Sequence, residues 1–453
     1  MKLARHSAHT VKSSPKTKGV WCVSTSRFFD PQLERIFPLH STIAADGTLE
    51  IGGCSVVALA NEYGTPLYVI DEQGLRDRMR DYRDGMAARW PNSQVTFASK
   101  SLPVLAVYAI AAAEGLGVDV AGAGELLLAL EAGVDPSLIH LHGNAKSDEE
   151  LTLAVEAGIG TIVVDGEADI ERLDALLSTR QEVLIRVIPD VDPRTHPSVS
   201  TGGAKSKFGL PIPQAQALIE RLREHPFIHV VGLHLHIGSQ VLELEPFARA
   251  VEAVAELGEF EVYNIGGGLG ADYNVGHEAP SLDAYLDTLT EAARRILPSG
   301  SRIIIEPGRS LVARAGVTVY RINNVKHTGD TFVAVNGGLA DQMNVALTDT
   351  RFTPIIGERA NQRPDTTAQI VGRQCESGDL LVDQAKLSDP QPGDTLVLAA
   401  TGAYGYTLSN NYNGALKPAV VLCKQGDARV AVRRQSYAEF LAPHLLNAPL
   451  SWA

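Results

Sequence analysis

The sequence predicts an α/β fold in which a (β/α)8 TIM barrel is followed by an all-β domain. From about residue 95, short β-branched runs alternate with Ala-, Leu- and Glu-rich stretches, which is typical of parallel βαβ units. Eight such runs occur, and eight is the number of strands that closes a TIM barrel. After Gly308 the alternation stops, and short β-rich runs broken by Gly, Pro and Asp take over.

The eight β-branched runs are the expected barrel strands. In chain order they are Val95–Ser99, Leu116–Ala121, Ile139–Gly143, Thr161–Asp165, Val183–Pro189, Ile228–Gly238, Glu261–Gly266 and Arg302–Gly308. Parallel neighbours need crossover connections, and helical stretches lie between the runs. These stretches include Pro103–Glu114, Gly124–Ala132, Ser147–Ala157, Glu167–Leu177, Ile212–Glu224 and Pro246–Leu257.

The second domain is expected to draw its strands from both ends of the chain. After the barrel, the β-rich runs are Val317–Ile322, Thr331–Val335, Thr395–Ala400, Ala419–Leu422 and Val430–Arg433. Before the barrel, Leu49–Ile51 and Pro66–Ile70 are also typical of strands, and we expect both to join this unit. The expected bounds are residues 31–70 and 313–445 for the β domain and 71–312 for the barrel.

Residues 1–30 form a basic start in which no acid precedes Asp30. Its composition favours a disordered tail over a transit peptide. In the whole chain the net charge is −13, which argues against a nucleic-acid partner because phosphates would be repelled. The chain contains no run of 18 apolar residues, so no membrane span is predicted. The four cysteines are scattered, which is typical of a reducing cytoplasm.

Polar residues cluster where the barrel strands should end, which is where a TIM barrel carries its active site. Lys100 follows the first strand, and His234 and His236 alternate along the sixth, so both face one side. Two histidines on one strand could hold a metal ion, but no third ligand with suitable spacing is obvious, so we predict no metal. Glycine-rich turns follow the last two strands, at Gly266–Gly270 and Glu306–Arg309.

This combination matches the needs of pyridoxal phosphate. Loops after the last two strands of a TIM barrel often bind phosphate through bare backbone N–H groups. Lys100 could attach to the cofactor aldehyde, and Glu306 could keep the ring nitrogen protonated. The glycine run also satisfies a dinucleotide pattern, but no helix opens directly after it, so that alternative is weak.

Taken together, the motifs resemble the barrel-type pyridoxal-phosphate decarboxylases (fold type III), and within them the diaminopimelate decarboxylase family. The resemblance runs from about Gly52 to near Arg434. The matching motifs are Phe97–Lys100, Asp119–Leu126, His142–Ser147, Ser206–Gly209, His234–Gln240, Gly266–Gly270, Glu306–Arg309, Cys375–Asp379 and Gly402–Asn413. It implies a pyridoxal-phosphate enzyme that decarboxylates an amino acid.

The resemblance also implies roles for single residues. Lys100 is similar to the cofactor lysine, His236 to the imidazole stacked on the ring, and Glu306 to the partner of the ring nitrogen. The other implied cofactor-binding residues are Asp119, Ser239, Gly267, Gly268, Gly308, Arg309 and Tyr404. Substrate contacts are expected from Arg309, Tyr404 and Glu376. In this family Cys375 acts as a proton donor and, like Glu376, enters the site from the partner subunit, which implies a homodimer.

Diaminopimelate is the substrate that the resemblance implies, with lysine and carbon dioxide as products. Asn344 and Thr348 stand where the family carries an arginine and a tyrosine that grip the distal carboxylate. A relative that decarboxylates another amino acid therefore remains an alternative. Asn264 and Asn336 also replace the usual aspartates.

Three other classes stay open at this stage. An amino-acid racemase would use the same cofactor but would normally need a second base opposite the lysine. A non-catalytic relative would have no reason to keep Lys100, His236, Glu306, Cys375 and Tyr404 together. A barrel that processes sugars or phosphates would lack the visible absorption of a lysine-bound pyridoxal.

Overall fold

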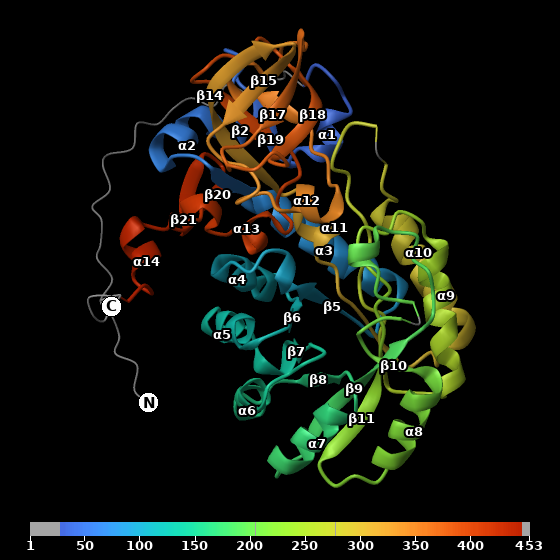
Figure 1. Ribbon diagram of the computed structural model, residues 1–453. Coiled ribbons are helices and arrows are strands. Elements are labelled where there is room, and N and C mark those ends of the chain that lie inside the picture. Colours follow the sequence, from blue (N-terminus) through green and yellow to red (C-terminus); the bar gives the residue numbers. More distant parts are fainter. Residues whose placement is uncertain (1–27, 204, 277, 446–453) are drawn as a thin grey trace.

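The computed structural model describes residues 28–203, 205–276 and 278–445, which form a barrel and a separate β domain (Figure 1). The predicted basic tail, residues 1–30, lies outside the described residues except for its last three. In Figure 1 the barrel is the lower body and the β domain the upper one. No helix in the described ranges is long and apolar enough to cross a membrane.

Eight parallel strands close the barrel, as predicted. They are β5 (Ser93–Ala98), β6 (Gly117–Val120), β7 (Ile139–Leu141), β8 (Thr161–Val164), β9 (Gln181–Ile188), β11 (Ile228–His234), β12 (Val262–Asn264) and β13 (Arg302–Ile305). Each strand pairs with the next, and β13 pairs with β5 to complete the ring. A short strand, β10 (Leu210–Pro211), adds to β9. The (β/α)8 fold is therefore confirmed.

Helices cover the outside of this ring. They are α3 (Glu72–Arg89), α4 (Leu105–Ala113), α5 (Ala123–Glu131), α6 (Asp148–Glu156), α7 (Glu167–Leu176), α8 (Ile212–Leu222), α9 (Glu245–Ala253) and α10 (Leu282–Ile296). Side-chain caps fix several starts: Ser147 and Glu150 form a capping box on α6. Inside the ring, Val163, Leu184 and Val231 pack together from neighbouring strands. The barrel is thus filled below its mouth.

The β domain combines strands from both chain ends, as predicted. Its strands are β4 (Leu67–Asp71), β14 (Gly316–Thr328), β15 (Asp330–Val335), β16 (Pro354–Ile356), β17 (Thr366–Val371), β18 (Leu380–Leu387), β19 (Thr395–Leu398), β20 (Ala419–Lys424) and β21 (Asp427–Val432). Strand β4 precedes the barrel yet lies between β14 and β20. Five short helices are α1 (Leu33–Ile36), α2 (Val56–Tyr63), α11 (Arg309–Val312), α12 (Asn344–Thr348) and α13 (Gly405–Leu408), and α14 (Tyr437–Leu441) ends the described chain.

One predicted strand packs in this domain but lies outside its large sheet. Leu49–Ile51 forms strand β2, but it pairs with β1 (Ser41–Ile43) and β3 (Cys54–Ser55) in a small sheet of its own. The reason is local: Gly52 and Gly53 both have positive φ and turn the chain straight back into β3. Both edges of β2 are paired, one with β1 and one with β3, so β2 has no free edge for the larger sheet.

Candidate active site

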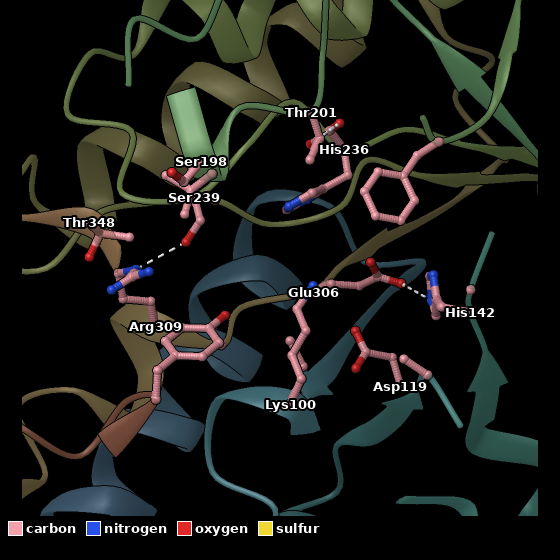
Figure 2. Close-up of a pocket in the computed structure, with 18 of the residues that line it drawn as sticks. Lys100, Asp119, His142, Ser198, Thr201, His236, Ser239, Glu306, Arg309 and Thr348 are labelled. Atoms are coloured by element: carbon pink, nitrogen blue, oxygen red, sulfur yellow. Dashed lines mark hydrogen bonds and ion pairs between the residues drawn. The ribbon is translucent and has the colours of Figure 1, made fainter. Parts of the chain in front are cut away.

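A cavity of about 470 Å3 opens at the carboxyl ends of the barrel strands, under the β domain (Figure 2). The barrel and the loops that follow its strands provide most of its wall, with Lys100 near the middle. The β domain closes one side with α12 and the segment around α13. Residues from that side are Asn344, Leu347, Thr348, Tyr404 and Leu408.

One end of the cavity is built to hold an anion. The buried Arg309 begins α11, and its Nε donates to Ser239 Oγ at 3.0 Å. Its Nη1 donates to the Tyr273 hydroxyl at 2.5 Å, and the guanidinium lies 4.7 Å from the centre of the Tyr404 ring. These contacts fix a permanent positive charge beside a hydroxyl.

The floor between the strands admits only glycine at several positions. A Cβ on Gly268, whose φ is +125°, would lie 2.4 Å from the Gly238 carbonyl oxygen. A Cβ on Gly308 would lie 2.9 Å from the Ala98 Cβ. Both glycines line the cavity, so backbone can approach a ligand closely there. Gly267 does not line it; a Cβ there would meet the Glu306 carbonyl oxygen at 2.0 Å.

The other end carries the buried Glu306. Its Oε1 lies 3.0 Å from His142 Nε2 and accepts from Asn264 Nδ2 at 2.6 Å, while its Oε2 lies 3.1 Å from His234 Nε2. Burial raises the pKa of Glu306, but His142 and His234 outweigh burial and hold it well below the usual range. Glu306 is therefore a carboxylate.

Lys100, Asp119 and His236 lie between the two ends. Lys100 sits on a 3-10 turn directly after β5 and opens into the cavity. Asp119 Oδ1 accepts from the Ser99 N–H at 3.0 Å, and its pKa is raised well above its ordinary value by burial and by the charge of Glu306. His236 Nδ1 accepts from the Gly267 N–H at 3.2 Å, and burial together with Lys100 lowers its pKa well below its ordinary value.

Two predicted site residues lie away from this cavity. Cys375 and Glu376 are exposed in the loop between β17 and β18, and neither is part of the cavity wall. The Cys375 N–H donates to Asn413 Oδ1 at 2.7 Å, so the loop is tied to its own domain. Within one chain, the described residues do not bring Cys375 and Glu376 to Lys100.

Sequence reasoning gave no role to several wall residues. Ser198, Val199 and Thr201 come from the long loop after β9, and Thr201 Oγ1 donates to the His236 carbonyl oxygen at 3.0 Å. Only the length of that loop could have signalled them. Nothing in the sequence pattern signalled Tyr273, which lies outside the motifs and contacts Arg309 from below.

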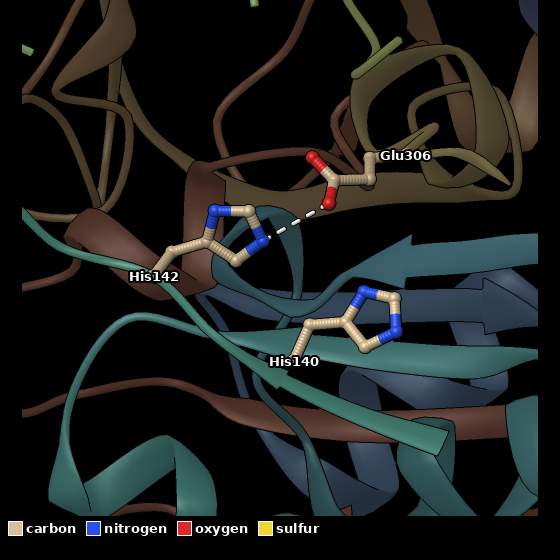
Figure 3. Close-up of side chains that lie close together, drawn as sticks. All are labelled: His140, His142 and Glu306. Carbon is tan, nitrogen blue, oxygen red and sulfur yellow. Dashed lines mark ion pairs between the residues drawn. The ribbon is translucent and has the colours of Figure 1, made fainter. Parts of the chain in front are cut away.

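Three buried side chains meet the geometry of a metal site. The ligand atoms of His140, His142 and Glu306 all lie within 4.8 Å of one another (Figure 3). His142 and Glu306 already pair with each other and line the cavity, whereas His140 lies deeper in the barrel. Of the predicted histidine pair, His234 pairs with Glu306 instead of facing a metal ligand set.

The arrangement fits pyridoxal phosphate. The glycine floor with Arg309 and Ser239 offers donors to a phosphate, and Glu306 offers an anion to a protonated ring nitrogen. Lys100 lies between them, within reach of an aldehyde on the same ring (Figure 2). The donor set thus suits each part of this cofactor.

Comparisons with known proteins agree with this geometry. The family model "Pyridoxal-dependent decarboxylase, pyridoxal binding domain" matches residues 73–313. A diaminopimelate decarboxylase of Actinosynnema pretiosum is 40% identical over 427 residues, which cover 91% of this chain and 96% of that protein. The Bacillus subtilis diaminopimelate decarboxylase is 37% identical, covering 89% and 97%. A crystal structure of the M. jannaschii diaminopimelate decarboxylase with L-lysine superposes with a TM-score of 0.83 at 30% identity, covering 90% and 98%.

Proposed function

Because the chain belongs to the diaminopimelate decarboxylase family of pyridoxal-dependent decarboxylases, we propose that it converts meso-diaminopimelate to L-lysine and carbon dioxide. The observation that carries the proposal is the position of Lys100 between an anion-binding end and a buried carboxylate in one cavity.

Bound pyridoxal phosphate supplies the electron-accepting ring that makes loss of carbon dioxide possible. Arg309 and Ser239 would hold its phosphate, and Glu306 would place a negative charge at the ring nitrogen. His236 packs as a neutral imidazole over the cavity and adds no charge there. Lys100, which opens into the cavity between these two ends, would be the amine that attaches the cofactor aldehyde.

We infer that the working unit is a homodimer in which each subunit completes the site of the other. The support is that Cys375 and Glu376 are exposed and lie off the cavity of their own chain. In the partner site, Cys375 would return the proton to Cα and Glu376 would bind the distal ammonium group of the substrate.

Subunit mixing tests this arrangement. Lys100→Ala and Glu376→Ala should each be nearly inactive alone. After mixing and exchange, about one quarter of wild-type activity should return, because half of the dimers are mixed and each has one intact site of two. Mixtures that stay inactive, with subunit exchange verified by a tag, would contradict the shared site.

A second candidate substrate is an amino acid without a distal carboxylate. Asn344 and Thr348 both line the cavity, and neither carries the charge that a carboxylate would favour. The Thr348 hydroxyl is already bonded to the Asn344 carbonyl oxygen and to Thr350. Ornithine and lysine are the simplest members of this class.

The experiment that separates these substrates uses the holoenzyme with meso-diaminopimelate, lysine, ornithine, arginine and glutamate in turn. Release of carbon dioxide with lysine as the product of diaminopimelate supports the proposal. A cofactor-loaded enzyme that releases carbon dioxide only from lysine or ornithine would favour the second candidate substrate.

The free cysteines at positions 54, 375 and 423 support a cytoplasmic location.

A further inference from the structure

The buried amide of Asn264 joins the two halves of the cofactor site. Its Nδ2 donates to Glu306 Oε1 at 2.6 Å, and its Oδ1 accepts from the Gly266 N–H at 3.0 Å. The Gly266 carbonyl oxygen in turn accepts from the Glu306 N–H at 2.8 Å. One side chain therefore links the carboxylate at the acid end to the first glycine of the cavity floor.

We propose that Asn264 is a positioning residue that orients the Glu306 carboxylate toward the cofactor ring without adding charge to it. This inference rests on the proposed function, because it assigns Glu306 to a ring nitrogen. Asn264 does not line the cavity, so it acts through Glu306 and not by touching the ring. It is 1% exposed, which excludes a solvent role.

The amide of Asn264 makes both contacts without a titrating proton, unlike the aspartate that the family resemblance leads one to expect at this position. An aspartate could accept from Gly266, but its ionised form could not donate to Glu306, and two carboxylates at 2.6 Å would repel strongly. A leucine could make neither contact and would leave Glu306 with one donor fewer in a buried site. An amide serves both neighbours at every pH, whereas an aspartate serves both only while it is protonated.

His234, which also contacts Glu306, adds no charge beside it. Burial lowers the pKa of His234 to about 3, so this ring donates as a neutral imidazole. Because His234 is uncharged, it does not compensate the negative charge of Glu306. That charge stays available to a cationic ring nitrogen. The titratable or charged groups that interact with Glu306 are Asp119, His140, His142, Arg186, His234, His236 and Tyr285.

The test compares the holoenzyme with Asn264→Asp, Asn264→Leu and, as a matched control on an exposed asparagine, Asn92→Asp. Visible absorption of the bound cofactor is recorded against pH. Asn264→Asp should show an additional titration absent from wild type and from Asn92→Asp, because a new carboxyl beside Glu306 shares a proton with it. All other facing groups are common to the four proteins, so the difference isolates the new carboxyl.

Asn264→Leu gives the second readout. Its apoenzyme should bind pyridoxal phosphate about tenfold more weakly or worse, and kcat should fall by about 10- to 100-fold with KM little changed, since a hydrogen bond to a charged group is lost. Asn264→Asp should recover activity toward the acid side of its new titration, where the carboxyl is protonated and can donate as the amide does. If Asn264→Leu does not fold, the spectrum of Asn264→Asp decides alone.

The inference is wrong if both variants keep the wild-type spectrum at every pH together with wild-type cofactor affinity and kcat. A wild-type protein that binds no pyridoxal phosphate would instead remove the proposed function itself. The two failures are thus distinguished by the unmodified enzyme.

Discussion

The two walls of the cavity differ in how deeply their side chains are buried and how many hydrogen bonds hold them. On the barrel side, Glu306 and Arg309 are each 6% exposed and each is fixed by several hydrogen bonds. On the β-domain side, the short helix α12 leaves Leu347 48% exposed, and the Asn344 amide donates only a 3.3 Å bond to the Ala403 carbonyl oxygen. We call the barrel side the rigid wall and the β-domain side the looser wall. The rigid wall suits the cofactor, which is the same in every turnover, and the looser wall suits the selection of the substrate.

Removing the central residue of the barrel wall should have the largest effect. Lys100→Ala should lower kcat by at least about 1000-fold, because the cofactor loses its covalent attachment and the reaction its amine. The measurement is carbon dioxide release from meso-diaminopimelate at saturating cofactor. Lys386→Ala, on an exposed strand of the β domain, is the control and should keep wild-type activity. A Lys100→Ala enzyme whose kcat stays within tenfold of wild type would show that Lys100 is not the lysine that attaches the cofactor.

The rigid wall is also the part that could be predicted from the sequence. Lys100, His236 and Glu306 lie at ends of barrel strands, and a closed parallel barrel brings those ends to one mouth whatever its loops do. The period of the β-branched runs thus determined both the fold and where these side chains meet. The observed strands end a few residues before the predicted ones, since the chain leaves the ladder to form the active-site loops.

The looser wall could be predicted only in outline. Strands β16, β17 and β18 were not predicted, because β16 has only three residues and polar residues interrupt the apolar ones of β17 and β18. Leu49–Ile51 was predicted as a strand of this domain, but nothing in the sequence indicated that it lies in a small sheet of its own. Leu408 reaches the cavity from the end of the four-residue helix α13, whose path depends on tertiary contacts. A sequence pattern carries little information about such contacts, because no repeat or strand end fixes them.

Neutralising the carboxylate of the rigid wall should rank second. Glu306→Gln should lower kcat by about 100-fold while the Arg309 end still holds the cofactor phosphate, because a preorganised charge is lost and not a binding anchor. Turnover and cofactor affinity measured together separate these effects. Glu182→Gln, an exposed glutamate on β9, is the control. Equal losses of cofactor affinity and kcat would mean that Glu306 anchors the cofactor instead.

Changing the looser wall should alter selectivity and not chemistry. Asn344→Arg adds a cation to the cavity and should raise the preference for diaminopimelate over lysine by about tenfold, the value of one charged hydrogen bond. The ratio of kcat/KM for the two substrates is the measurement, and Asn344→Gln is the uncharged control. An unchanged ratio with normal cofactor binding would place the distal end of the substrate elsewhere.

The smallest expected effect concerns the support of the looser wall. Asp341 precedes α12, is 3% exposed, and accepts from the Tyr320 hydroxyl at 2.6 Å and from the Gly338 N–H at 3.2 Å. Burial raises its pKa to about 7, so between its ordinary value and about 7 the folded protein binds more protons than the unfolded chain. Its contribution must therefore make stability fall as pH rises through that window and level off above it.

Asp341→Asn should remove this slope. From about pH 5 to about pH 8, the Tm of the variant should rise relative to wild type by about one to two degrees, the shift that about 1–2 kcal/mol produces in a chain of this size. Thermal unfolding of both proteins across this range is the measurement, and Asp383→Asn, an exposed residue on β18, is the control. Parallel Tm curves for wild type and Asp341→Asn would mean that Asp341 is ionised throughout, and that the loop leading to α12 tolerates a buried carboxylate as the barrel wall does at Glu306.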